Sequence, residues 1–204
     1  MVAEGALREL VNAIVQDEKE ALRVLAASSE LARARFERGA TRQDSKAYFL
    51  EAIACYLYEG DTPLHVAAAA YRAALAAQLL THGADLHARN RRGATPLHSA
   101  VRGGPGSASW APEAQVGMIG LLIAAGADPN AVDSGGVTPL HRAVRNRCAA
   151  AVQALLEGGA DAGRKNKSGS TALTLAQQNT GRGGTGSAEA KAEQSEILRL
   201  LGAP

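Results

Sequence analysis

The sequence predicts an all-α solenoid of stacked helix-turn-helix units. A Thr-Pro-Leu-His motif begins at residues 62, 95 and 138, and a weaker copy begins at residue 171. A Gly-Ala-Asp tripeptide follows at residues 83, 126 and 159, and Gly202 and Ala203 close the last unit. Self-similarity at a fixed period is typical of repeat proteins, in which each unit buries its apolar face against the next one.

Each copy of the motif contains the residues that begin a helix. The threonine, for example Thr138, can cap a helix with its hydroxyl, and the proline after it suits the first helical position, where no N–H is needed. The leucine begins a buried stripe, and the small alanine two residues after the histidine lets two helices approach closely. The glycine at the far end of a unit, for example Gly159, can adopt a positive φ and end the second helix.

With this motif and a unit of about 33 residues, the chain resembles ankyrin-repeat proteins. The resemblance covers residues 58–204 more closely than residues 1–57. It implies an ankyrin solenoid and non-enzymatic recognition of another protein through the finger loops and the concave face. The Ala-, Arg- and Gly-rich composition is typical of bacterial members. A scaffold does not specify its partner, so the partner has to be sought in the exposed residues.

We expect a single ankyrin-repeat domain over residues 1–204. Its predicted parts are 1–57 (a degenerate capping repeat plus a helical insertion), 58–89 (repeat one), 90–132 (repeat two, with a ten-residue inserted loop), 133–166 (repeat three) and 167–204 (a C-terminal capping repeat with an insertion).

Local patterns add detail to this division. Two short helices are expected within residues 7–27, and a further helix should run through residues 33–38 to Gly39. The apolar run at residues 46–58 predicts the helical insertion. Glycine-rich joints at residues 103–107 and 181–187 should break repeats two and four, because glycine at that density ends a helix.

The composition argues against several classes of function. The net charge of +2 gives no reason to expect a nucleic-acid or membrane partner, and the chain has no apolar run of transmembrane length. The N-terminus lacks the charged-then-apolar pattern of a signal peptide. Cys55 and Cys148 lie far apart in the sequence and form no disulfide framework. We therefore expect a cytoplasmic monomer.

Some histidine and cysteine residues could in principle bind a metal ion or act in catalysis, but a structural role explains them better. His65, His98 and His141 occupy equivalent repeat positions, so they cannot converge on one metal ion. The resemblance instead implies that each bonds to loop and motif groups. Cys148 has arginine neighbours but no base partner, which favours a small buried thiol. We expect no catalytic residue, no metal and no cofactor. The structural motif residues are Thr62, Pro63, Leu64, His65, Thr95, Pro96, Leu97, His98, Thr138, Pro139, Leu140 and His141.

The candidate protein-binding residues follow from the positions at which ankyrin proteins meet their partners. They are Tyr58, Glu59, Asp61, Arg91, Arg92, Arg102, Trp110, Val137, Arg145, Asn146 and Lys167. The resulting surface would be acidic at one end and basic along the rest, which favours a partner with an acidic surface. Two roles stay open for Trp110, the only tryptophan: anchoring its own loop, which we favour, or contacting the partner.

Three other functions are compatible with the same residues. The chain could be a regulatory, effector or inhibitor subunit of a neighbouring enzyme. A small-ligand or enzymatic site could lie in the atypical region 28–58, where convergent polar groups around a pocket would support it. The basic fingers could bind nucleic acid, which would show as an affinity that falls steeply with salt.

Overall fold

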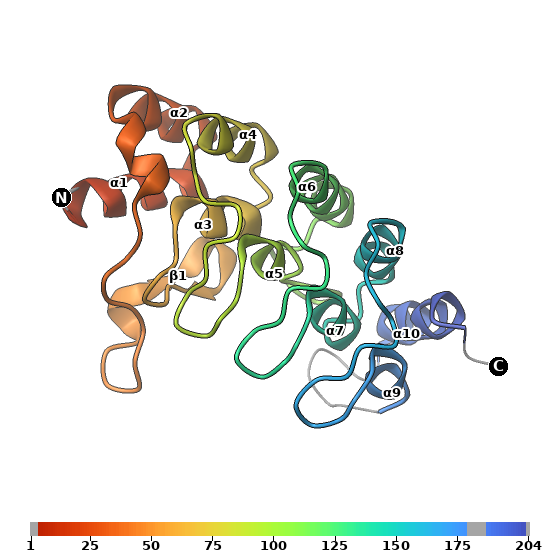
Figure 1. Ribbon diagram of the computed structural model, residues 1–204. Helices are drawn as coiled ribbons and strands as arrows, with labels where there is room; N and C mark the ends of the chain where they lie inside the picture. Colours follow the sequence, from red (N-terminus) through yellow and green to blue (C-terminus); the bar gives the residue numbers. More distant parts are fainter. Residues whose placement is uncertain (1–3, 179–186, 203–204) are drawn as a thin grey trace. The chain divides into compact units, whose positions relative to one another are not determined.

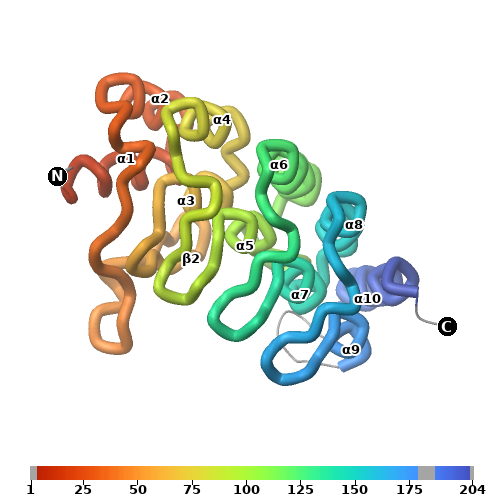
Figure 2. The backbone as a smooth tube through the Cα atoms, viewed as in Figure 1, coloured from red at the N-terminus to blue at the C-terminus, as the bar shows by residue number. Residues whose placement is uncertain are grey.

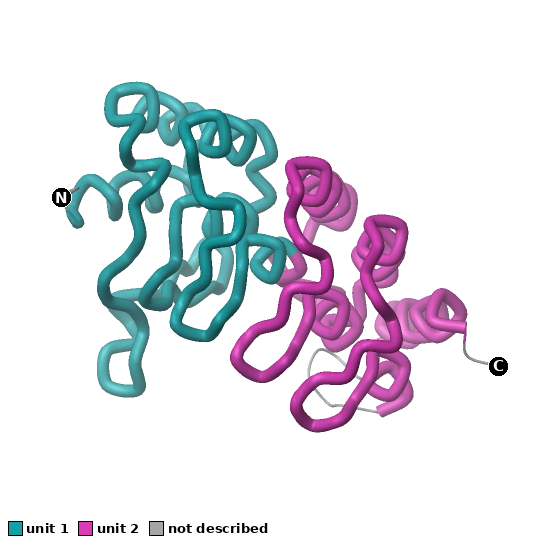
Figure 3. The backbone as a smooth tube through the Cα atoms, in the orientation of Figure 1, with its two compact units in different colours: residues 1–100 teal, residues 101–204 magenta. Residues whose placement is uncertain are grey.

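The computed structural model describes residues 4–178 and 187–202. The chain divides into two compact units, residues 1–100 and 101–204 (Figure 3). Unit 1 contains the helices α1 (Glu4–Gln16), α2 (Glu18–Ala27), α3 (Pro63–Ala69), α4 (Ala73–Thr81) and α5 (Pro96–Ala100). Unit 2 contains α6 (Pro112–Ala124), α7 (Pro139–Arg145), α8 (Ala149–Glu157), α9 (Ala172–Gln177) and α10 (Ala188–Leu200). The all-α class of the prediction is confirmed.

Within each unit the helices form two rows (Figure 1). In unit 1, α3 packs against α1 and α5, while α2 packs against α4. In unit 2, α7 packs against α9, and α8 packs against α6 and α10. The core between the rows consists largely of leucine and alanine, including the fully buried Leu64, Leu75 and Leu155. Small side chains allow this close packing of short helices.

The Thr-Pro-Leu-His motif begins the first helix of a repeat as expected. The hydroxyl of Thr138 accepts a hydrogen bond from the backbone N–H of His141, and the ring of His141 accepts one from the backbone N–H of Thr138. Thr62 and His65 form the same reciprocal pair at the start of α3. The proline between them occupies the first turn of each helix. These two pairs satisfy backbone donors that a helix start otherwise leaves open.

Figure 2 shows the course of the finger loops along the chain. A second repeated pattern, of side-chain hydrogen bonds, holds them. The side-chain oxygen of Asn90 accepts hydrogen bonds from the backbone N–H groups of Arg92 and Ala94, which closes a tight loop. Asp133 and Asn166 hold their loops through the equivalent backbone groups. A glycine of positive φ lies three residues after each of these side chains. Hydrogen bonds between a side chain and the backbone of the same loop therefore fix the conformation of these three finger tips.

The region before repeat one differs from the prediction. Two α-helices precede it, as expected, but residues 28–58 contain no further α-helix. They form three short 3₁₀ helices (Ser29–Arg33, Lys46–Tyr48 and Glu51–Ile53) and a hairpin of the strands β1 (Phe49–Leu50) and β2 (Cys55–Tyr56). The predicted helices through 33–38 and over 46–58 are therefore wrong.

The physical reason is that this segment extends a finger loop. Backbone hydrogen bonds join Phe36 to Asp61 and Ala40 to Leu57, so residues 36–40 run along the finger that leads into α3. We call residues 36–61 the enlarged finger. Gly39 does not end a helix: a Cβ atom there would clash with the backbone of Tyr58 and Glu59. Glycine permits this close approach of two chain segments.

The two predicted glycine-rich joints have different outcomes. Residues 101–111 lead from α5 to α6 without forming helix or strand, as expected. The joint predicted at 181–187 lies outside the described residues, except for Ser187, whose hydroxyl caps α10 at Ala190. The four glycines predicted to end second helices, at 83, 126, 159 and 202, all have positive φ. The predicted repeat and domain boundaries stay predictions.

Among the described residues, no helix is both long and apolar enough to cross a membrane.

Candidate functional site

The finger tips of unit 1 bring three predicted binding residues together. The backbone N–H of Arg91 donates to the carbonyl oxygen of Glu59 at 2.7 Å, which aligns two successive tips. The guanidinium carbons of Arg91 and Arg92 then lie 5.7 and 5.1 Å from the ring centroid of Tyr58. We call Tyr58, Arg91 and Arg92 the tip cluster. Two cations against one aromatic ring form an ordered, positively charged surface feature.

Hydrogen bonds fix both arginines of the tip cluster. Nη2 of Arg91 donates to the carbonyl oxygen of Ala40 at 2.6 Å, and Nη1 of Arg92 donates to the phenolic oxygen of Tyr58 at 2.9 Å. Both arginines are exposed, while Tyr58 is half-buried. Among the residues that the structure describes, neither arginine forms an ion pair with a carboxylate. The cluster therefore keeps its positive charge.

Asp61 is buried, although we expected it on the binding surface. It is only 5 % exposed, and its carboxylate accepts from the side chain of Asn90 and from the backbone N–H of Tyr58. The buried carboxylate thus connects two finger loops from inside. We remove Asp61 from the candidate surface, while Glu59 stays exposed at the tip.

The candidate residues of unit 2 are less closely grouped. Arg145 and Lys167 are exposed, and the backbone N–H of Lys167 donates to Gly135, which aligns two tips as in unit 1. Val137 is half-buried at the base of its finger. The side-chain amide of Asn146 donates to the carbonyl oxygen of Val101 at 2.7 Å, so this residue helps to hold the repeat-two loop.

The finger of repeat three carries an internal ion pair. Arg142 donates to Asp133 at 2.8 Å. Burial raises the pKa of Asp133, but the Arg142 hydrogen bond and the backbone N–H groups of Val137 and Gly135 outweigh burial and hold the pKa below its usual value. This finger is therefore electrically neutral at its base, unlike the tip cluster of unit 1.

Trp110 anchors its own loop. Its indole N–H donates to Gln115 Oε1 at 3.2 Å, and Gln115 Nε2 donates to the carbonyl oxygen of Arg102 at 2.7 Å. The thiol of Cys148 donates to the same oxygen of Gln115. Gln115 is fully buried and thus joins both ends of the loop to the start of α8. Trp110 is half-buried in this arrangement.

The recurring histidines use both ring nitrogens in hydrogen bonds. Nδ1 of His65 accepts from the backbone of Thr62, so Nε2 carries the proton and donates to Ala94 O at 3.0 Å. His141 bonds to Thr138 and Ser170 in the same way. Burial lowers the pKa of His141 below its usual value, which favours the neutral ring. Within the described ranges, no group of three or more His, Cys, Asp or Glu side chains could hold a metal ion.

Cys148 is not placed as a nucleophile. It is fully buried, and burial raises the pKa of its thiol. The neutral thiol is the unreactive form.

Family models of ankyrin repeats match most of the chain. A model described as ankyrin repeats in three copies matches residues 5–111, and one described as ankyrin repeats in many copies matches residues 122–176. A model of a single ankyrin repeat matches residues 92–134. The chain belongs to the ankyrin-repeat family. A search of curated proteins found no match. Ankyrin repeats generally mediate protein–protein interactions and are typically non-enzymatic scaffolds.

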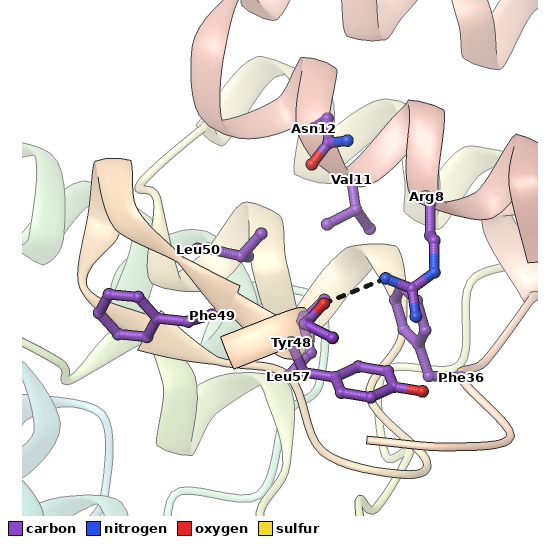
Figure 4. A pocket seen from close by; sticks show the side chains of 9 residues that line it. Arg8, Val11, Asn12, Phe36, Tyr48, Phe49, Leu50 and Leu57 are labelled. Atoms are coloured by element: carbon purple, nitrogen blue, oxygen red, sulfur yellow. Dashed lines mark hydrogen bonds between the residues drawn. The ribbon is translucent and has the colours of Figure 1, made fainter. Parts of the chain in front are cut away.

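Several residues of this ankyrin-repeat chain were missed at the sequence level. Asn90, Asp133 and Asn166 carry the finger geometry, and their shared position three residues before a glycine could have revealed them. Gln115 gives no such signal, because its role depends on three partners at unrelated spacings of 5, 13 and 33 residues. The same holds for Arg8, which lies over the ring of Tyr48 at 4.8 Å and lines a cavity beside the enlarged finger (Figure 4).

Proposed function

We propose that this ankyrin-repeat chain is a non-enzymatic protein-binding module whose tip cluster in unit 1 engages an acidic group on the partner's surface. The observation that carries the proposal is the pair of guanidinium groups held against Tyr58 without a carboxylate partner among the described residues. A positive surface feature of this kind is complementary to aspartate or glutamate side chains.

The geometry favours binding because the arginines are already ordered. Each guanidinium has five N–H donors, and Arg91 and Arg92 each use one side-chain nitrogen in the hydrogen bonds described above. The remaining donors can pair with both oxygens of a carboxylate. Because the side chains are held by Ala40 and Tyr58, little further conformational entropy is lost when the partner binds.

The partner need not contact unit 1 alone. Arg145 and Lys167 add positive charge to unit 2, and Glu59 adds the acidic end expected beside Tyr58. We assign Trp110 and Asn146 to the support of the repeat-two loop, since their side chains are engaged there. We further propose a monomer in a reducing, cytoplasmic compartment, where a chain with two buried cysteines far apart in the sequence is expected.

A paired affinity capture tests the proposal. The wild-type chain and the variant Arg91→Glu/Arg92→Glu are used as bait in lysate from the native organism, and the captured proteins are quantified by mass spectrometry. We expect a protein with an acidic surface to be enriched by the wild type and lost by the variant. Equal recovery of every protein by the two baits would contradict the proposed role of the tip cluster.

A further inference from the structure

The hairpin of the enlarged finger has two different faces. Phe49 pairs with Tyr56 in the antiparallel register of β1 and β2. The backbone N–H of Leu57 donates to the carbonyl oxygen of Tyr48 at 2.8 Å, which continues this register by one pair. Because successive side chains of a strand point to opposite faces, the first pair lies on one face of the hairpin and the second pair on the other.

The burial of the side chains follows these two faces. Tyr48 and its partner are buried, and so are Leu50 and Cys55, which pair on the same face. Phe49 and Tyr56 are 36 % and 39 % exposed, and they are the large hydrophobic side chains that lie exposed in the described part of the chain. Their ring centroids are 4.7 Å apart, so the two rings form one apolar surface. We call these two residues the aromatic pair.

The aromatic pair is continuous with the tip cluster. Tyr58 follows Tyr56 by two residues, the spacing that returns a side chain to the same face of an extended chain. Leu57 between them is buried, and its carbonyl oxygen accepts from the backbone N–H of Ala40. The carbonyl oxygen of Ala40 in turn accepts from Nη2 of Arg91. One face of the finger therefore carries three aromatic rings, and the last of them lies against two guanidinium groups.

This composition is that of a binding surface. Aromatic and arginine side chains are enriched in protein interfaces, and exposed apolar patches beside polar groups mark interaction sites. The two guanidinium groups are complementary to a carboxylate, and the aromatic pair is complementary to an apolar side chain. A partner that fits the whole surface thus has to present both kinds of group close together.

We propose that the tip cluster and the aromatic pair together bind a short segment of a partner protein that carries a large apolar side chain close to a carboxylate. This inference rests on the proposed function, because the carboxylate is the acidic group that Arg91 and Arg92 engage. The aromatic pair adds the requirement for the apolar side chain.

The two parts of the surface contribute differently to binding. Salt screens the attraction between the guanidinium groups and a carboxylate. Contact of the aromatic pair with an apolar side chain removes nonpolar surface from water and is not screened. Loss of the aromatic pair should therefore lower the affinity at every salt concentration, while loss of the arginine charges should also remove the salt dependence.

A selection of random peptides displayed on phage, with the full chain as the target, tests the inference. We expect the enriched peptides to carry an acidic residue within about four positions of a large apolar residue, the range over which side chains share one face of a strand or a helix. Unselected phage give the background frequency of this pattern. Selection on Arg91→Glu/Arg92→Glu should not enrich it.

The dissociation constant of an enriched, labelled peptide is then measured by fluorescence anisotropy. Phe49→Thr/Tyr56→Thr should weaken binding at least about tenfold and keep its salt dependence, since a few aromatic side chains carry much of the binding energy of an interface. Threonine suits a strand, and the melting temperature should stay within about 4 °C of the wild type's. Tyr56→Phe keeps the ring, and Gln43→Thr changes another exposed residue of the enlarged finger. Both controls should bind as the wild type does.

A change in the peptide checks the same contact without altering the folded chain. Replacing the apolar residue of the peptide by serine should weaken binding to the wild type but hardly change binding to Phe49→Thr/Tyr56→Thr, because both changes remove one and the same contact. The inference is overturned if no peptide is enriched, or if Phe49→Thr/Tyr56→Thr binds as tightly as the wild type. Enriched peptides with acidic residues but no apolar residue nearby would also overturn it, while leaving the proposed function intact. Enriched peptides without acidic residues would contradict both.

Discussion

Nε2 of His141 lies 3.0 Å from the carbonyl oxygen of Ser170, so the first helix of repeat three is bonded to the finger that leads into repeat four. The other ring nitrogen accepts from the backbone of Thr138 and completes the start of α7. His65 makes the same connection from α3 to Ala94. The motif histidine therefore stabilises both its own helix and the junction to the next repeat.

His141→Ala should lower the free energy of unfolding by about 1–2 kcal/mol, because it removes buried hydrogen bonds and leaves backbone groups unpaired. Urea denaturation followed by circular dichroism measures the loss. His87→Ala is the control, since His87 is exposed in a finger loop. Equal stability of the two variants would contradict the structural role of His141.

The same histidine predicts a pH dependence. Because burial lowers the pKa of His141 in the folded chain, the unfolded chain binds a proton more readily. The stabilisation is fully present above the unfolded pKa of about 6.5 and is lost as the pH falls through the folded pKa. We expect the melting temperature to fall between about pH 7.5 and pH 5, and to fall less in His141→Asn. An identical pH profile for both proteins would count against this account.

Gly39→Ala tests the enlarged finger. The added Cβ would meet the backbone of Tyr58 and Glu59, which cannot move aside as a flexible side chain could. We expect a loss of about 1–3 kcal/mol in unfolding free energy, typical of overpacking. Gly5→Ala serves as the control, because a Cβ at Gly5 has nothing within 4 Å and alanine favours the helix α1. Equal stability of the two variants would contradict the close approach of Gly39 to the backbone of Tyr58 and Glu59.

The repeat pattern was predictable because its determinants are local. Thr138 and His141 are three residues apart, so their reciprocal hydrogen bonds follow from the sequence. The segment 46–58 was not predictable in the same way. Its apolar spacing fits a helix, but Leu57 bonds to Tyr48 and to Ala40 as part of the enlarged finger. Contacts distant in sequence outweighed the local preference.

In the candidate site, too, the local features were predictable from the sequence and the long-range contacts were not. The exposure of Arg91 and Arg92 follows from their place in a finger, and the resemblance to ankyrin repeats is enough to predict it. Their common contact with Tyr58 depends on the alignment of two fingers through Glu59 and Arg91. Asp61 precedes the motif threonine, which suggested an exposed position, yet its carboxylate is used to join Asn90 to the preceding finger.

We propose that the tip cluster guides an acidic partner onto unit 1. The most direct test is the association rate constant of the captured partner, measured at about 0.05 M and about 0.3 M salt, where screening differs strongly. Arg91→Glu/Arg92→Glu is compared with Lys19→Glu/Arg23→Glu, which makes the same charge change at exposed positions of α2. We predict that the tip variant associates at least about tenfold more slowly at low salt, with a smaller difference at high salt, and that the α2 variant is unaffected. Unchanged association of the tip variant, or an equal loss in the α2 variant, would contradict the account.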